Sequence, residues 1–127
     1  MSEQSRPQLS WANEVASSDG TSIAVVALDG ELDLGVLEVL DEALAERPDD
    51  AAGVVVDLTE LAFVDSAGIQ ALVAARDALE EAGQPNAFVV VPGSNVERIL
   101  QMTGLLERLE SHPDRDSALA VVARAGE

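Results

Sequence analysis

The sequence predicts an α/β fold in which helices cover a mostly parallel β-sheet. Two short apolar runs, at 53–58 and 87–91, have the continuous hydrophobicity of strands that are buried on both faces. Segments with the apolar spacing of amphipathic helices alternate with these runs. Only 2% of the residues are aromatic, so the core must consist of Val, Leu, Ile and Ala, which favours strands packed under helices. The expected order is ββαβαβα(β)α, which the connection rules convert into one layered sheet.

A β-hairpin followed by a helix is expected at the start of this order. The turn signal Asp19-Gly20 separates two segments whose apolar side chains fall on odd positions, which is typical of paired strands. These side chains are Leu9, Trp11, Val15, Ile23, Val25 and Ala27. Leucines at 34, 37, 40 and 44 then predict an amphipathic helix of about three turns, with Asp33 placed to cap it and Pro48 to end it.

The rest of the chain continues the alternation. A central strand over 53–58 is followed by a helix that is expected to start near Ser66 and to end at Gly83. After the strand at 87–91, Ser94 and Glu97 have the spacing of a capping box, and Gly104 is placed to end the third helix. The sequence allows a short last strand within 105–111 and a final helix over 114–124. One domain is therefore expected over 9–124, with polar tails at 1–8 and 125–127.

Composition excludes several classes of function. The chain has 127 residues, with 24 acidic residues against seven Arg and no Lys, and its formal net charge is -17. It therefore lacks the basic surface that direct nucleic-acid binding requires. One His and no Cys argue against zinc and iron sites, so neither a metal nor another cofactor is expected. No stretch reaches the ~18 apolar residues of a membrane span, and the start is polar, so we expect a cytoplasmic protein without membrane insertion.

Ser66 is the residue with two chemical interpretations. As a helix N-cap, its hydroxyl would accept a hydrogen bond from a free N–H of the first turn. As a reactive group, it would lie exposed at a helix N-terminus, where unpaired N–H groups and a partial positive charge accommodate a phosphoryl group. Both interpretations stay open from the residues alone.

Two other chemistries are disfavoured. V-D-S-A-G lacks the first Gly of a nucleophile elbow, and the single histidine, His112, lies in a polar stretch, so a serine hydrolase is not expected. Asp57 ends the predicted central strand, as a phosphate-accepting Asp does in receiver domains, but no Lys is present to neutralise a phosphoryl group. We interpret Asp57 as a strand-end residue that faces solvent or pairs with a nearby turn N–H.

Three segments resemble the STAS domain family, and within it the bacterial anti-sigma factor antagonists. They are GELD at 30–33, VVVDLTELAFVDSAGIQAL at 54–72 and VERILQMTGL at 96–105. The resemblance implies one STAS-like domain, with a mixed sheet of four or five strands and about four helices packed mainly on one side. It further implies a regulatory binding protein rather than an enzyme.

The resemblance also assigns a switch. In this family a partner that is both serine kinase and anti-sigma factor phosphorylates the serine of the D-S-x-G turn, here Ser66, and a metal-dependent serine phosphatase reverses the modification. The unphosphorylated form binds the anti-sigma factor, which frees the sigma factor. The implied partner-binding residues are Asp33, Asp65, Ser66, Ala67, Gly68, Ile69 and Leu72. Ala67 stands where many relatives have a second hydroxyl, and Gln70 where many have Gly.

A second hypothesis follows from the same resemblance. STAS domains also serve as scaffolds or accessory subunits of signalling assemblies and lipid transporters, which use the same surface without phosphorylation. The serine at position 66 favours the phosphorylation switch.

Overall fold

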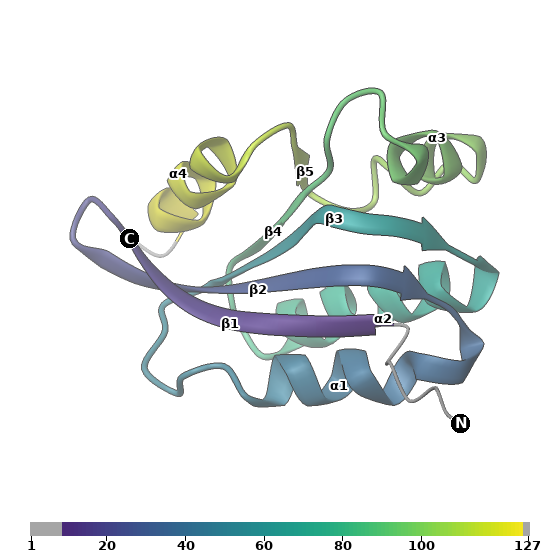
Figure 1. Cartoon of the computed structure of the whole chain (residues 1–127). Coiled ribbons are helices and arrows are strands. Elements are labelled where there is room, and N and C mark those ends of the chain that lie inside the picture. The colour runs from purple at the N-terminus through teal and green to yellow at the C-terminus, as the bar shows by residue number, and fades with distance from the viewer. Residues whose placement is uncertain (1–8, 126–127) are drawn as a thin grey trace.

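Five strands form one mixed sheet in the order β1-β2-β3-β4-β5 (Figure 1). The structure, a computed structural model, describes residues 9–125. The strands β1 and β2 are antiparallel, and β3, β4 and β5 each add parallel to their neighbour. Their bounds are β1 Leu9–Ser18, β2 Thr21–Leu32, β3 Val54–Val64, β4 Asn86–Val89 and β5 Ser111–His112. This arrangement confirms the predicted fold class and the opening hairpin.

The hairpin turn has the backbone that its sequence predicts. Asp19 and Gly20 both have positive φ, at 52° and 78°. A two-residue turn of this kind matches the right-handed twist of the flanking strands. The predicted tail at 1–8 lies outside the described residues, as do residues 126–127 of the tail predicted at 125–127, whereas Ala125 belongs to the last helix.

Within residues 9–125, three helices and one 3₁₀ turn connect the strands, and a fourth helix follows β5. The helices are α1 (Leu37–Ala45), α2 (Ser66–Glu81), α3 (Asn95–Met102) and α4 (Arg115–Ala125). The predicted start of α2 is therefore confirmed. The first helix is shorter than predicted, because Leu34–Val36 form a 3₁₀ turn that Asp33 caps. Leu34 is consequently not part of the apolar stripe of α1.

The two faces of the sheet bury two separate clusters. Because side chains alternate along a strand, Val54 and Val56 of β3 point to one face and Val55 to the other. The first face packs against buried side chains of α1, α2 and α3, and the second packs against α4. Figure 1 shows α1 and α2 side by side, with α4 on the opposite side of the strands. The helices thus lie mainly on one side, as predicted.

Three strand boundaries differ from the sequence prediction. β3 continues to Val64, whereas the sequence predicts an end at Leu58. The prediction stops early because two register shifts against β2 break the apolar alternation that marks a strand. β4 ends at Val89 rather than at 91, and the last strand is confined to 111–112. The extension of β3 carries the chain directly to Asp65 and the start of α2.

An ion pair fastens α4 to the second face of the sheet. Arg115 donates from Nε and Nη2 to Oδ2 of Asp57 at 3.0 and 2.8 Å, and from Nη1 to Glu14 at 3.2 Å. Thr59 donates its N–H to Oδ1 of Asp57 at 2.9 Å, and its hydroxyl donates to the same oxygen. Of the two predicted alternatives, the local pairing with an N–H is found, but its donor lies within β3 rather than in a turn. Asp57 is inside β3 rather than at its end, and it does not face solvent, because α4 covers it. The sequence does not indicate this pairing, because Arg115 is 58 positions after Asp57 and no local pattern connects the two residues.

This network predicts how stability changes in acid. Burial by itself raises the pKa of Asp57, but the hydrogen bonds from Thr59 and then from Arg115 outweigh burial and lower that pKa below its ordinary value. A lowered pKa stabilises the fold above the ordinary Asp pKa of about 4, and this contribution is lost as pH falls through the lower folded-state value. Between pH 6 and pH 3, the free energy of unfolding measured in urea titrations should therefore decrease less for Asp57→Asn than for the unchanged chain. Equal losses would contradict this account of Asp57.

Candidate functional site

The predicted switch serine lies where two neighbouring parallel strands end. Asp33 directly follows the carboxyl end of β2, and Asp65 directly follows the carboxyl end of β3. The last residues of the two strands, Leu32 and Val64, are paired with each other, so the two aspartates leave the sheet side by side. In open α/β sheets, ligands and partners bind at these carboxyl ends. The local geometry thus brings Asp33, Asp65 and Ser66 to one surface.

The side chain of Asp65 connects two segments of this surface. Its Oδ1 accepts the N–H of Gly68 at 2.7 Å, which caps α2, and its Oδ2 accepts the N–H of Leu34 at 3.2 Å. One carboxylate therefore joins the helix start to the 3₁₀ turn after β2. Asp33 makes a local bond only, accepting the N–H of Gly35 at 3.0 Å.

Ser66 itself is the first residue of α2 and is exposed. The interpretation of Ser66 as the N-cap is wrong, because Asp65 is in the capping position and has the extended backbone of a cap. Two other hydroxyls near the strand ends are engaged in local bonds. The hydroxyl of Thr59 donates to Asp57, and Ser94 caps α3 by accepting the N–H of Glu97 at 3.1 Å. The hydroxyl of Ser66 is thus presented outward rather than used to close a helix.

Three of the predicted contact residues are buried. Ile69 is 4% exposed and Leu72 is fully buried in the cluster under α1 and α2. Gly68 lies against β2, where an added Cβ would be 2.4 Å from the carbonyl oxygen of Leu32. These three residues, which the resemblance implies as partner-binding, therefore lie beneath the surface, because the apolar side of α2 faces the sheet. They position the surface, whereas Ser66 and the half-buried Ala67 lie on it.

Comparison with known proteins agrees with this geometry. The family model of the STAS domain matches residues 14–118. The chain belongs to the STAS domain family. The anti-sigma-F factor antagonist RsfB of Mycobacterium tuberculosis is 34% identical to it over 93 residues, which cover 72% of this chain and 74% of that protein. The predicted resemblance to STAS domains and to anti-sigma factor antagonists is confirmed.

Solved structures of similar fold come from two kinds of protein. An anti-sigma factor antagonist from Mycobacterium paratuberculosis superimposes with a TM-score of 0.71 at 28% identity, covering 94% of this chain and 99% of that chain. A sulfate transporter family protein from Wolinella succinogenes gives a TM-score of 0.68 at 19% identity, covering 81% and 86%. The second likeness shows the STAS fold alone. Within residues 9–125, no helix has the length and apolar character needed to cross a membrane.

Two exposed apolar side chains of this STAS domain were not predicted as site residues. Leu34, in the 3₁₀ turn, is 72% exposed, and Phe63, near the end of β3, is 42% exposed. Helical spacing assigned Leu34 to the apolar stripe of the first helix, and the bulges of β3 hide the orientation of Phe63. A signal was nevertheless present, because both residues are within three positions of the D-S-A-G segment or of Asp33.

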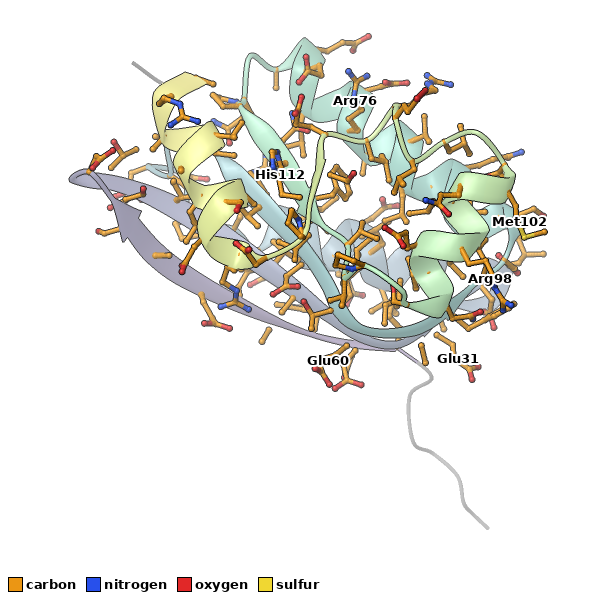
Figure 2. The ribbon with its side chains drawn as sticks, turned by 90° about the horizontal axis from the view of Figure 1, so that it is seen from above. Glu31, Glu60, Arg76, Arg98, Met102 and His112 are labelled. Atoms are coloured by element: carbon orange, nitrogen blue, oxygen red, sulfur yellow. The ribbon has the colours of Figure 1, made fainter. Side chains whose placement is uncertain are left out.

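Carboxylates dominate the charge around this end of the STAS domain. Glu31 and Glu60 are exposed on the neighbouring strands β2 and β3, and Figure 2 shows them on one edge of the molecule. Arg98 of α3 lies beside the same strand end: it donates to Asn95 at 2.6 Å, and Asn95 donates to the carbonyl of Ala62 at 3.2 Å. The candidate site is therefore an acidic surface with a basic side chain at its margin.

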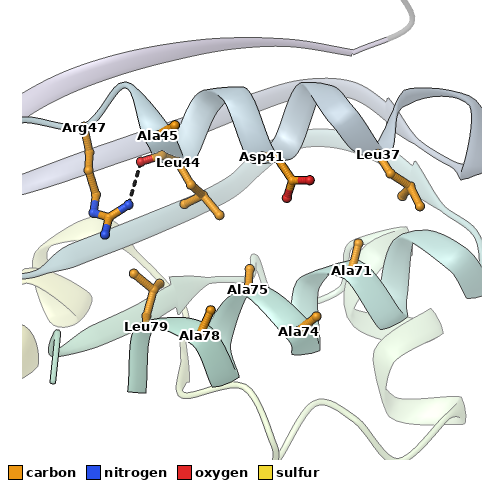
Figure 3. A pocket seen from close by; sticks show the side chains of 10 residues that line it. All are labelled: Leu37, Asp41, Leu44, Ala45, Arg47, Ala71, Ala74, Ala75, Ala78 and Leu79. Carbon is orange, nitrogen blue, oxygen red and sulfur yellow. Dashed lines mark hydrogen bonds between the residues drawn. The ribbon is translucent and has the colours of Figure 1, made fainter. Parts of the chain in front are cut away.

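A groove between α1 and α2 forms a separate surface of the STAS domain (Figure 3). Its volume is about 480 Å³, and its walls are mostly Leu and Ala, with Asp41 and Arg47 as its charged residues. None of the predicted contact residues lines it. The groove and the surface around Ser66 are therefore independent features.

The capping geometry predicts opposite behaviour for two adjacent substitutions. Asp65→Ala removes two backbone hydrogen bonds and should lower the free energy of unfolding by about 1–2 kcal/mol, the typical value of an N-cap. Ser66→Ala removes an exposed hydroxyl and should change it by less than about 0.5 kcal/mol. Urea unfolding of the two variants tests this, and a larger loss for Ser66→Ala would mean that Ser66 supplies the cap.

Proposed function

We propose that this STAS domain is an anti-sigma factor antagonist whose binding is switched by phosphorylation of Ser66. The unphosphorylated form binds a partner that is both anti-sigma factor and serine kinase, and the sigma factor is thereby released. The kinase phosphorylates Ser66 and ends the interaction, and a metal-dependent serine phosphatase restores it. The domain acts as a regulatory binding protein in the cytoplasm and does not itself catalyse a reaction.

The observation that carries this proposal is that Ser66 is exposed at the start of a 16-residue helix that another residue caps. Because Asp65 supplies the cap, modification of Ser66 need not disrupt the helix. The N–H groups of Ser66 and Ala67 precede the first intrahelical bond, so they remain available to a phosphate. The names of the relatives from the two Mycobacterium species support the partner class.

Electrostatics explain how the modification would end binding. A phosphoserine adds about -1.5 to -2 charge near neutral pH. Here the added charge would lie beside Asp65 and near Asp33, Glu31 and Glu60, and burying it in an interface carries a desolvation cost of several kcal/mol unless cations are supplied. The partner is therefore excluded by charge and size.

A second function follows from the resemblance to the STAS domain family, and the fold shared with the Wolinella succinogenes sulfate transporter family protein is compatible with it. In this alternative the domain is an accessory subunit or scaffold that uses the same surface, and Ser66 is never modified. The two functions differ in one property, which is whether a kinase partner modifies Ser66.

Phosphopeptide mapping separates them. The chain is incubated with ATP and an anti-sigma factor kinase from the same organism, then digested and analysed by mass spectrometry. We expect a single modified residue, Ser66, and no modification of the Ser66→Ala variant. Modification of Thr59 or Ser94 would contradict the assignment of the acceptor, and a chain left unmodified would favour the accessory role.

Charge should also affect the rate of association. The net charge of -17 and the carboxylates around Ser66 should steer the chain toward a basic patch on its partner, which is screened as salt rises. We expect the association rate constant, measured by stopped-flow fluorescence, to fall about tenfold or more between low and physiological ionic strength. An unchanged rate would mean that steering plays no part.

A further inference from the structure

We propose that Leu34 and Phe63 are the apolar anchors through which the surface around Ser66 binds its partner. The occupant is a protein whose contact face has an apolar pocket ringed by basic side chains. The inference rests on the proposed function, because it takes this protein to be the anti-sigma factor kinase. It replaces the buried Ile69 and Leu72 as the apolar part of the interface.

Leu34 and Phe63 are two of the four large apolar side chains that are exposed within residues 9–125, the others being Val15 and Met102. Among the described leucines, Leu34 is the one that is exposed. The other phenylalanine, Phe88, is fully buried, whereas Phe63 is 42% exposed. Scattered exposed apolar residues are ordinary, but aromatic side chains are enriched at protein interfaces, and an aromatic or aliphatic side chain that fills a pocket is a common anchor.

Backbone contacts place both anchors next to Ser66. The N–H of Leu34 is bonded to Asp65, the residue before Ser66, at 3.2 Å. Phe63 is three positions before Ser66, and its Cα pairs with that of Glu31 on β2. Val64, the next residue, is buried under α2, so alternation along β3 directs Phe63 to the opposite face. Leu34 and Phe63 therefore lie at the same end of the sheet as Ser66, with Phe63 on the face opposite α2.

The surrounding charge defines the chemistry of the partner. Glu31 and Asp33 precede Leu34 along the chain, and Glu60 and Asp65 flank Phe63. An apolar centre with an acidic rim is complementary to an apolar pocket with a basic rim. The same rim disfavours membranes with anionic headgroups and nucleic acid, which leaves a protein as the occupant.

The test compares three exposed apolar positions. Leu34→Ser and Phe63→Thr remove the anchors, and Val15→Thr is the matched control, since Val15 is 61% exposed but lies on β1 opposite Ala24, at the far end of β2. Calorimetric titration with the anti-sigma factor kinase gives the dissociation constants. ATP is omitted so that Ser66 is not phosphorylated during the measurement. Each anchor variant should bind at least tenfold more weakly, the control should bind like the unchanged chain, and Leu34→Met should retain binding. Urea unfolding midpoints verify that each variant is folded.

The outcomes distinguish this inference from the proposed function. If the unchanged chain binds and is released on phosphorylation while Leu34→Ser binds equally well, the anchors are refuted and the switch stands. If the unchanged chain does not bind the kinase, both are refuted. A loss of binding in Val15→Thr as large as in the anchor variants would also overturn the inference, because it would show no specificity for this surface.

Discussion

A chain that carries phosphoserine at position 66 should bind the anti-sigma factor at least a thousandfold more weakly than the unmodified chain. This factor corresponds to about 4 kcal/mol, within the cost of burying a dianion beside carboxylates. The chain contains no Lys, and the described basic residue at the margin of this surface, Arg98, is already bonded to Asn95. The phosphorylated chain can be made by kinase treatment and separated by ion exchange, and calorimetry gives both affinities.

The matched control is a chain that carries phosphoserine far from this surface. Ser22 is exposed at the amino end of β2, the end opposite to Ser66, so the same charge introduced there should weaken binding far less. Equal losses at positions 66 and 22 would indicate that net charge alone, not local exclusion, controls binding.

The loss of binding should occur without refolding of the domain. Asp65 retains the cap of α2 after modification, so chemical-shift changes should be confined to residues near Asp33, Ser66 and the first turns of α2. Shifts spread through β1 or α4 would instead indicate that phosphorylation rearranges the fold.

Gly68→Ala should be the most destabilising single-methyl addition on this surface. Its Cβ would lie 2.4 Å from the carbonyl oxygen of Leu32 and 2.7 Å from Cγ2 of Val64, and both distances are shorter than nonbonded contacts of Cβ atoms in proteins. The start of α2 must move away from β2, which also strains the bond between Asp65 and Leu34. We expect a loss of about 3 kcal/mol in the free energy of unfolding.

Gly35→Ala provides the control for this substitution. Gly35 lies in the neighbouring 3₁₀ turn, and a Cβ there would meet Asp33 Oδ1 at 3.4 Å, an ordinary contact. Its free energy of unfolding should therefore change by less than about 1 kcal/mol. If the two variants unfold at the same urea concentration, the close approach of α2 to β2 does not contribute to the stability of the domain.

Local patterns predict most of this fold because each strong element has a short-range signal. The Asp19-Gly20 turn, the start of α2 at Ser66 and the cap at Ser94 each depend on residues a few positions apart. β3 beyond Leu58 was missed, because its bulges remove the regular alternation on which strand prediction depends.

The candidate site was predicted in part for the same reason. The D-S-A-G segment identifies Ser66, but which of two adjacent polar residues caps the helix is decided by backbone angles, and Asp65 has the capping geometry. The bond from Leu34 to Asp65 spans 31 positions, and the pair of Asp57 with Arg115 spans 58. Contacts of that range leave no periodic trace, so neither the exposure of Leu34 nor the burial of Asp57 could be predicted.

The most direct test of the switch is one binding experiment with two chains and two conditions. The unchanged chain and Ser66→Ala are each titrated into the anti-sigma factor kinase, first without ATP and then after incubation with ATP and Mg²⁺. We predict equal binding of both chains without ATP, and loss of binding after ATP for the unchanged chain only. Binding of the unchanged chain that persists after ATP, or an equal loss for Ser66→Ala, would contradict the assignment of Ser66 as the switch.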